Sequence, residues 1–282
     1  MIHILRGGIL VAALGLFAVS AQERAEFPFA SGVGRLRVRV NGQGPFPFGF
    51  DTGASGMGWV SRSLVTRLQL PPAGGFRVSD GSTSMSSEGV QIASLELGPV
   101  RVERAVVPVL NNGSCDVDSE TVCGTLGLDA FRGYSFTLDY PGKRIVVSRE
   151  PLPAEGADVV RYTRQHGSPR VEMSIAGVVF STWIDSGNWG TMLLPMALAK
   201  ELPLVGELAP AGKVGTVVRE YALFKAQLAG DVTLGGVRIE RPEVYFSEMV
   251  KEPNLGRGIL QNLVTTFDTV GERVRFGRPV VR

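Results

Sequence analysis

Hydrophobic and polar residues alternate over short stretches along most of the chain. Residues 35–40 switch strictly between arginine and an aliphatic residue, and residues 95–97 and 100–102 show the same two-residue period. A period of two places successive side chains on opposite faces of the backbone, as in a strand with one buried face. Glycine, proline and asparagine separate these stretches, so the pattern predicts an all-β fold with tight turns. Helical segments look short, and residues 61–70 and 195–202 are the two best candidates.

The chain repeats a series of landmarks in the same order, at an offset of about 135 residues. Four pairs of segments match: 36–53 with 171–187, 95–104 with 232–241, 124–127 with 258–261, and 136–139 with 265–268. β-Sheet sequences produce one such match easily, but several in register indicate a tandem duplication. The join falls within residues 148–157. We therefore expect an N-terminal lobe over residues 31–152 and a C-terminal lobe over residues 158–282.

The first 21 residues have the organisation of a secretory signal peptide. Arg6 precedes an apolar run over residues 9–18, and small residues follow at positions 19–21. This order predicts cleavage after Ala21 and a periplasmic or secreted mature protein. The run is shorter than the roughly 20 apolar residues of a transmembrane helix. An uncleaved membrane anchor is the alternative interpretation of the same segment.

Composition limits the chemistry that the chain can perform. The net charge is only +2, and no basic run with interleaved aromatic residues is present, so nucleic acid is a poor candidate partner. The two histidines are His3, within the signal, and His166, which nearly excludes Ser-His and metal chemistry. In an exported protein, Cys115 and Cys123 are expected to form a disulfide. We expect no cofactor, no membrane span in the mature chain, and a monomer.

The candidate chemistry lies in two short motifs at equivalent places in the duplicated chain. Asp51-Thr52-Gly53 follows an apolar stretch, and Asp185-Ser186-Gly187 follows another. A single such triplet is weak evidence, because these residue types favour turns anywhere. Two copies at matching positions, each after a buried strand, indicate a shared function.

Together with the segment VNGQGPFPFGFDTGAS at residues 40–55, these motifs resemble the pepsin and retropepsin superfamily of aspartic peptidases, and its exported bacterial members most closely. The resemblance covers nearly all of residues 31–282. It implies a two-lobed, all-β barrel fold from an internal duplication, with one catalytic aspartate from each lobe. Asp51 and Asp185 would then be the catalytic carboxylates of an endopeptidase that cleaves peptide or protein substrates.

The resemblance also assigns supporting roles. Thr52 and Ser186 match the positions whose hydroxyls cross-link the two aspartate loops. Gly53 and Gly187 would let the backbone turn sharply beside the carboxylates. A second element, two apolar residues and a glycine, is expected to cross behind each loop. Residues 125–127 fit that pattern, whereas residues 259–261 depart from it with Gln261 in place of glycine.

The paired carboxylates explain the expected reaction. Two carboxyls held close together share one proton, so the charged one acts as a general base on water and the protonated one donates to the scissile carbonyl. In the superfamily, a hydroxyl after each triplet often donates to the carboxylate, but here those positions are Ala54 and Asn188. We expect the Asn188 amide to donate to Asp185, leaving the shared proton on Asp51 and favouring activity at mildly acidic pH.

Two further features are candidates for substrate binding. Residues 78–85 form a polar turn between apolar flanks, with Asp80, Gly81 and Ser82 at its tip. This turn is either a flap over the substrate or a plain surface hairpin, and its second-lobe counterpart, residues 212–221, is less flap-like. Trp189 either lines a substrate pocket or is a core aromatic beneath the aspartate loop.

Two other functions compete with the peptidase hypothesis. Asn188 is unusual after the triplet, which suggests a catalytically inactive relative that binds peptides or proteins in the cell envelope. A structural β-module of the envelope is the third interpretation, but it leaves the two matching aspartate motifs unexplained.

Overall fold

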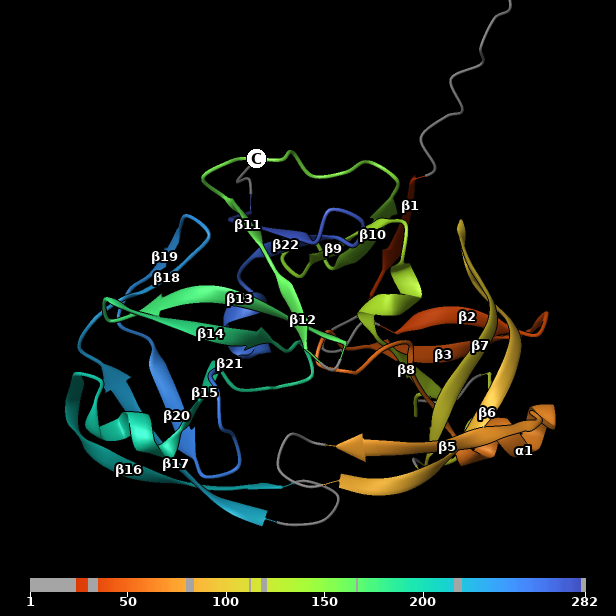
Figure 1. Ribbon diagram of the computed structural model, residues 1–282, viewed down its shortest axis with the longest axis horizontal. Helices are drawn as coiled ribbons and strands as arrows, with labels where there is room; N and C mark the ends of the chain where they lie inside the picture. The colour runs from red at the N-terminus through yellow and green to blue at the C-terminus, as the bar shows by residue number, and fades with distance from the viewer. Residues whose placement is uncertain are drawn as a thin grey trace, which may run out of the picture.

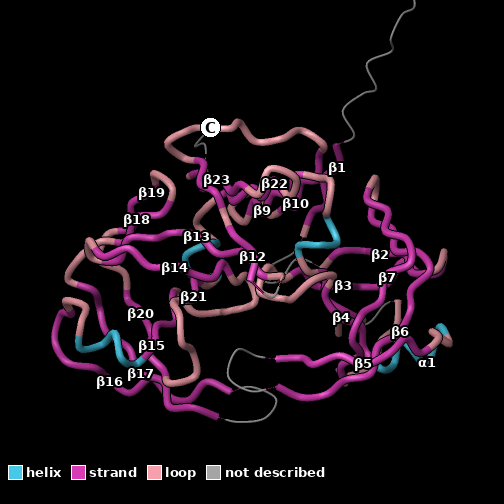
Figure 2. The backbone as a smooth tube through the Cα atoms, in the orientation of Figure 1, coloured by secondary structure: helices cyan, strands magenta, loops and turns pink. Residues whose placement is uncertain are grey.

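The computed structural model describes residues 24–29, 35–79, 84–111, 113–117, 121–165, 167–215 and 220–279. The proposed signal peptide and His166 lie outside these residues. The described chain is built almost entirely of strands, with a few short helices (Figure 2). Two sheets form the two lobes and a third lies between them (Figure 1), so the expected all-β, two-lobed fold is confirmed.

The first lobe contains a closed barrel. Its elements are β2 (Leu36–Val40), β3 (Gln43–Phe50), β4 (Gly58–Ser61), α1 (Arg62–Leu68), β5 (Pro72–Ser79), β6 (Ser84–Leu97), β7 (Val100–Leu110), β8 (Gly124–Leu126) and η1 (Leu128–Phe131). The strand order is β2-β3-β8-β4-β7-β6-β5, and β6 returns to pair with β2, which closes six strands into a barrel. The alternation in β2 buries its three aliphatic residues in the barrel and exposes its arginines.

The second lobe is a ten-stranded sheet that curves into a half-barrel. Its elements are β12 (Thr163–Gln165), β13 (Ser168–Ile175), β14 (Val178–Ile184), β15 (Met192–Pro195), η2 (Met196–Lys200), β16 (Leu204–Gly215), β17 (Glu220–Leu228), β18 (Val232–Leu234), β19 (Val237–Ile239), β20 (Glu243–Ser247), β21 (Asn254–Leu255) and α2 (Arg257–Leu260). The chain between β19 and β20 is not a continuous strand. Arg241 has a φ of 36°, and Pro242 has no N–H to donate to a neighbouring strand. The first lobe has one continuous strand there, β7.

Strand pairings repeat between the lobes, as the duplication predicts. The parallel pair β3–β8 corresponds to β14–β21, and β4–β7 corresponds to β15–β20. The antiparallel pair β2–β6 corresponds to β13–β18. Each aspartate motif therefore follows a central strand with the same neighbours in both lobes.

One predicted correspondence is wrong by five residues. The Asp51 N–H donates to the carbonyl of Leu126 at 3.0 Å, and the Asp185 N–H donates to that of Leu255 at 2.9 Å. The strand behind Asp185 is therefore β21, followed by Gly256, rather than residues 259–261. Those residues lie in and just after α2, where the exposed Gln261 side chain donates to the Gly258 carbonyl at 3.4 Å. The expected glycine is thus present, as Gly256.

The third sheet joins the two lobes. It contains β1 (Arg24–Pro28), β9 (Ser135–Asp139), β10 (Arg144–Ser148), β11 (Val159–Arg161), β22 (Val264–Asp268) and β23 (Arg273–Gly277). The order is β1-β10-β9-β22-β23-β11, so one strand from each half of the chain meets its counterpart at the centre. There Thr137 lies opposite Thr266, with their hydroxyls 2.8 Å apart. This pair marks the approximate two-fold axis between the lobes.

Aromatic residues fill the core directly behind the first aspartate. The rings of Phe50, Phe131 and Phe136 pack with centroids 4.0–5.5 Å apart. All three are at most 3% exposed, and Phe50 is the residue before Asp51. Because large buried aromatics contribute strongly to core stability, this cluster fixes the strand that carries the motif.

The helices are few and short, as the sequence predicts. Helix α1 begins after Ser61, whose hydroxyl accepts from the Leu64 N–H at 3.2 Å as an N-cap. The second expected helix is the short 3-10 helix η2. None of the helices in the described residues is long and apolar enough to cross a bilayer.

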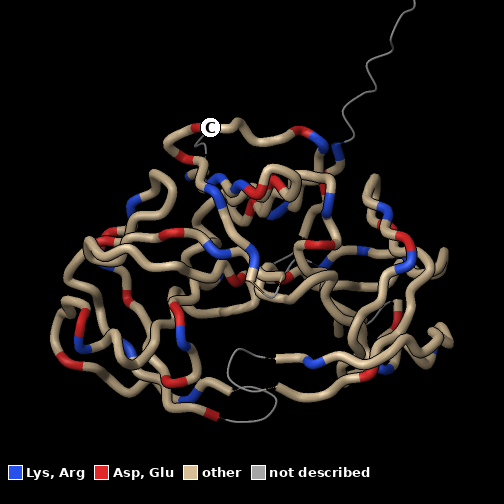
Figure 3. The backbone as a smooth tube through the Cα atoms, viewed as in Figure 1, with Lys and Arg blue, Asp and Glu red and all other residues tan. Residues whose placement is uncertain are grey.

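Charged residues of both signs are interspersed over the two lobes (Figure 3). Arg101, for example, pairs with Glu96 at 2.9 Å and with Glu103 at 3.0 Å on the outside of the first barrel. Exposed pairs of this kind contribute little to stability because water screens them. They balance the charge of the surface rather than concentrating it in one patch.

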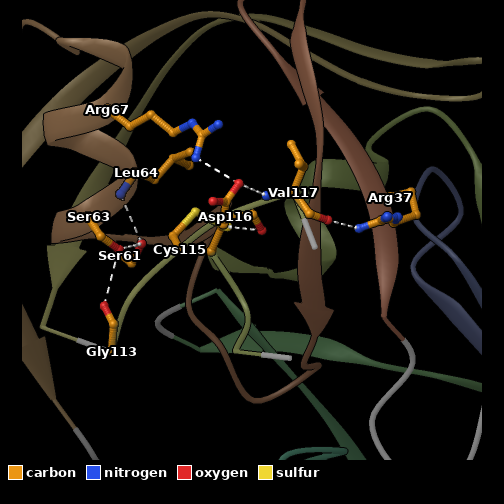
Figure 4. The surroundings of a disulfide bond; sticks show 10 residues. Arg37, Ser61, Ser63, Leu64, Arg67, Gly113, Cys115, Asp116 and Val117 are labelled. Carbon is orange, nitrogen blue, oxygen red and sulfur yellow. Dashed lines mark hydrogen bonds and ion pairs between the residues drawn. A yellow bond between two sulfur atoms is a disulfide. The ribbon is translucent and has the colours of Figure 1, made fainter. Parts of the chain in front are cut away.

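The predicted disulfide between Cys115 and Cys123 is present. The loop that it closes is held against the barrel by side chains from two elements (Figure 4). Arg67 of α1 donates to the carboxylate of Asp116 at 2.8 Å, and Arg37 of β2 donates to the Val117 carbonyl at 2.5 Å. The bond therefore secures an already anchored loop that leads into β8.

Replacing both cysteines, Cys115→Ala/Cys123→Ala, is expected to lower the free energy of unfolding by about 2 kcal/mol. The effect is modest because a short loop has little closure entropy to lose in the unfolded chain. Urea unfolding of the oxidised wild type and the double variant measures it. Reducing agent should bring the wild type to the variant's stability and leave the variant unchanged. A loss above about 5 kcal/mol would contradict this account.

Candidate active site

The two aspartate motifs occupy equivalent loops, each between the first central strand of a lobe and the next strand. Asp51 follows β3 and precedes β4, whereas Asp185 follows β14 and precedes β15. Each loop begins where its strand pairs in parallel with the short strand behind it. The backbone therefore leaves the sheet of each lobe in the same way, and the loops meet between the lobes.

Reciprocal hydrogen bonds lock the two loops together. The Thr52 N–H donates to Ser186 Oγ at 3.0 Å, and the Ser186 N–H donates to Thr52 Oγ1 at 2.9 Å. The Thr52 hydroxyl in turn donates to the Ile184 carbonyl at 2.7 Å. Thr52 and Ser186 are at most 1% exposed, so water cannot replace these bonds. This is the cross-link that the resemblance implies for these two positions.

The lock brings the carboxyl groups of Asp51 and Asp185 side by side. A single N–H, that of Gly187, donates to Oδ1 of Asp185 at 2.9 Å and to Oδ1 of Asp51 at 3.0 Å. The Gly53 N–H donates to the same oxygen of Asp51 at 2.7 Å. Both carboxyls thus point their inner oxygens toward one shared backbone donor.

The glycines of both motifs are required by this close approach. A Cβ atom on Gly53 would lie 2.5 Å from Oδ1 of Asp185, and one on Gly187 would lie 2.5 Å from Oδ2 of Asp51. Real Cβ atoms do not come so near to an oxygen. Each lobe therefore needs glycine to admit the carboxyl of the other lobe.

The variant Gly187→Ala is expected to lower the free energy of unfolding by about 2 kcal/mol, because its methyl group must push the loops apart. Gly277→Ala is the matched control, since its new Cβ would meet only the Val264 carbonyl at 3.7 Å. The control should change stability by less than about 0.5 kcal/mol. Urea unfolding of the two variants compares them, and equal stabilities would show that the loops are not in close contact.

The environment favours a proton on Asp51. Burial, and then the charge of Asp185, raise the pKa of Asp51 from 3.8 to about 8. The N–H groups of Gly53 and Gly187 act in the opposite direction but are outweighed. Burial also raises the pKa of the nearby Tyr140 to about 12, so its hydroxyl stays neutral. The geometry thus suits a pair of carboxyls that holds one proton at neutral pH.

The raised pKa of Asp51 has a consequence for stability. Between pH 4 and pH 8 the folded chain keeps a proton on Asp51 that the unfolded chain releases, so this carboxyl destabilises the fold increasingly as the pH rises. Asp51→Asn removes this cost. The stability of the variant relative to wild type should therefore increase by more than about 1 kcal/mol from pH 5 to pH 8.

Unfolding at several pH values measures this effect without requiring any activity. Asp116→Asn is the control, because the Val117 N–H and Arg67 lower the pKa of the exposed Asp116. This control should gain no stability over the same pH range. A constant difference between Asp51→Asn and wild type would contradict the protonated state of Asp51.

The expected direct contact from Asn188 to Asp185 is wrong. The Asn188 side chain turns away because its Oδ1 accepts the Gly190 N–H at 2.9 Å. Its Nδ2 donates to Oδ1 of Asn254 at 2.9 Å, and Asn254 Nδ2 donates to Oδ2 of Asp185 at 2.7 Å. Only the backbone N–H of Asn188 reaches Asp185, at 3.1 Å from Oδ1.

Asn254 is the site residue that the sequence reasoning missed. It lies on β21, paired with Trp183, one position before the residue that binds the Asp185 N–H. The five-residue error in matching residues 258–261 to residues 124–127 concealed it. A correct match places Asn254 at the position of Thr125 in the first lobe.

Trp189 is 70% exposed, so its interpretation as a core aromatic is wrong. One face of its ring stacks on the guanidinium of Arg257, whose Cζ lies 3.5 Å from the ring centroid. Arg257 is only 6% exposed and lies at the start of α2, behind the loop. The buried cation thus supports an indole that is open to solvent next to Asp185.

A cavity of about 660 Å³ opens beside the two aspartates. Nearly all of its lining comes from the second lobe, and its apolar wall includes Met192, Leu193, Leu223 and Met249. Trp189 also lines this cavity, in line with its interpretation as a pocket residue. The cavity therefore offers mainly apolar surface next to a polar pair.

The second-lobe hairpin has a larger role than expected. Strands β16 and β17 pair from Leu204 to Gly215 against Glu220 to Leu228, and Ala211, Lys213 and Val214 line the cavity. This hairpin, which was expected to be the less flap-like of the two, forms a wall of the site. Figure 1 shows it and the β5–β6 hairpin extending from their lobes toward the middle of the molecule.

The first-lobe flap is described only in its two strands, where Val78 lies opposite Met85. Its predicted tip, with Asp80, Gly81 and Ser82, lies outside the described residues. The choice between a flap and a plain hairpin at this position therefore stays a prediction.

The barrel of the first lobe, the half-barrel of the second and the two joined loops together form a two-lobed, pepsin and retropepsin-like fold. Residues 36–130 match the family model described as aspartyl protease, a segment that includes Asp51 but not Asp185. A search of curated proteins finds no match.

Proposed function

We propose that this protein is an aspartic endopeptidase in which Asp51 and Asp185 activate a water molecule between them. The observation that supports this most is the meeting of two carboxyls at a single N–H, from loops cross-linked by Thr52 and Ser186. Folding alone does not favour two adjacent carboxyls, because their repulsion is costly unless they share a proton.

In the proposed reaction, charged Asp185 takes a proton from the water, whose oxygen attacks the scissile carbonyl carbon. Asp51 donates its proton to the carbonyl oxygen at the same time. Collapse of the resulting tetrahedral diol breaks the C–N bond as Asp185 gives its proton to the leaving nitrogen and Asp51 takes a proton back from a diol hydroxyl. The raised pKa of Asp51 supports its assignment as the acid.

The cavity supports a peptide substrate with an apolar side chain next to the cleaved bond. Met192, Leu193 and Leu223 would bury such a side chain, and removal of apolar surface from water would contribute to binding. The exposed face of Trp189 adds a flat surface at the edge of the same cavity.

We also propose that the protein acts after export, in the periplasm or outside the cell. The disulfide between Cys115 and Cys123 supports an oxidising compartment, where such bonds persist. The signal-like sequence of residues 1–21 points to the same route.

Cleavage of an unfolded protein substrate tests the proposed function. Asp51→Asn and Asp185→Asn should each lower kcat/KM by about 10²–10⁴-fold, the usual contribution of general acid–base catalysis. Asp116→Asn, which changes an exposed aspartate paired with Arg67, is the control and should keep the wild-type rate.

Circular dichroism must show that all three variants fold. Wild-type protein that binds the substrate without cleaving it would favour the inactive binding module instead. Equal cleavage by the wild type and both aspartate variants would exclude these carboxyls as the catalytic groups.

A further inference from the structure

A chain of three hydrogen bonds ends on the outer oxygen of Asp185. The Gly190 N–H donates to Asn188 Oδ1 at 2.9 Å, Asn188 Nδ2 donates to Asn254 Oδ1 at 2.9 Å, and Asn254 Nδ2 donates to Asp185 Oδ2 at 2.7 Å. Asn254 is 5% exposed. Neither asparagine belongs to the Asp-Ser-Gly motif itself.

The direction of this chain is fixed by its first member. An amide side chain can present either oxygen or nitrogen to a neighbour, but a backbone N–H can only donate. Gly190 therefore requires the oxygen of Asn188, which turns the nitrogen of Asn188 toward Asn254. Asn254 in turn must present its own nitrogen to Asp185. The outer oxygen of Asp185 thus accepts a hydrogen bond from Asn254. A proton on that oxygen would face the amide nitrogen of Asn254, which cannot accept it.

Among its described residues, the first lobe lacks the corresponding chain of hydrogen bonds. Ala54 stands where the second lobe has Asn188, and Thr125 stands where it has Asn254. The donors that reach Asp51 from the described residues are the backbone N–H groups of Gly53 and Gly187, both at Oδ1. The two carboxyls are therefore related by the duplication but differ in their partners.

We propose that Asn254, oriented by Asn188, is a positioning residue that makes Asp185 the charged member of the pair and Asp51 the member that carries the proton. A donor to a carboxylate stabilises its charged form, and a bond to a charged acceptor is stronger than one between neutral groups. The inference rests on the proposed peptidase function, in which it gives the second lobe the base and the first lobe the acid.

Other ionisable groups face the pair, and they do not account for the difference. Tyr140 interacts electrostatically with both aspartates and with Arg257, and burial raises the pKa of Tyr140 to about 12. Lys213 and Tyr245 face the pair across the cavity, and Lys213 pairs with Glu220 at 2.8 Å. None of these groups changes when the asparagines are replaced.

The chain affects only one side of the pH profile. Asn254 stabilises the charge on Asp185 both when Asp51 holds its proton and after that proton has left. Removing the amide therefore makes the first proton of the pair easier to retain, and the acid limb of activity moves up. The alkaline limb, where Asp51 loses its proton, stays in place. Because the sites titrate together, these limbs belong to the pair.

Two variants give the second lobe the residues of the first, namely Asn254→Thr and Asn188→Ala. Asn254→Thr should raise the acid limb of kcat/KM by about one pH unit, equivalent to an about tenfold loss of activity below that limb. Asn188→Ala should shift it in the same direction by less. The double variant should match Asn254→Thr alone, since both residues act through one hydrogen bond. Asn262→Ala, which removes an exposed amide bonded to the Gly258 carbonyl, is the control.

Carbon-13 NMR of protein labelled at its aspartate carboxyls follows the same titration without activity. The inference is supported if the first titration step of the pair moves to higher pH in Asn254→Thr and the wild type cleaves the peptide. If Asn254→Thr shows this shift but the wild type cleaves no peptide, the proposed function is refuted and the assignment of charge is kept. An unchanged acid limb and first titration step in folded Asn254→Thr and Asn188→Ala would overturn the inference, as would equal movement of both limbs.

Discussion

The site depends on the reciprocal hydrogen bonds between Thr52 and Ser186. Each residue donates its backbone N–H to the hydroxyl of the other, in a place that water does not reach. Ser168 Oγ also joins the lobes here by donating to the Gly53 carbonyl at 2.9 Å, but only the Thr52–Ser186 bonds tie the two aspartate loops directly to each other. Buried bonds of this kind are costly to break because the freed groups find no other partner. The energy that holds the lobes in register thus also holds Asp51 against Asp185.

This symmetric frame carries an asymmetric pair of carboxyls. The duplication supplies the same strand, loop and glycine on both sides, whereas the side chains around each carboxyl differ. Asp51 has backbone donors, and the causes of its raised pKa are burial and the neighbouring charge. Asp185 has the Asn254 amide as well. A pair with one acid and one base needs such a difference, since two identical environments would leave the proton equally shared.

Much of this could be predicted from the sequence, because repeated patterns report directly on strands and loops. The alternation in residues 36–40 gave the buried face of β2, and the repeated triplets gave the two facing loops. The counterpart of β8 was misplaced because β21 has two residues and begins with Asn254 instead of an apolar residue. The orientation of Asn188 could not be predicted, since it depends on the N–H of Gly190 in the folded loop. The role of β16 and β17 likewise depends on how far their hairpin bends over the cavity.

The central claim is that the two carboxyls act as one catalytic pair, and binding of a non-cleavable peptide tests it most directly. Two peptides that differ only at the scissile position are needed, one with a tetrahedral hydroxyl and one with a methylene there. The hydroxyl mimics the diol of the transition state, so calorimetry should show it binding at least about 100-fold more tightly to the wild type. The preference should disappear in Asp51→Asn and Asp185→Asn. Equal binding of both peptides by the wild type would contradict the account and identify the cleft as a passive peptide-binding site.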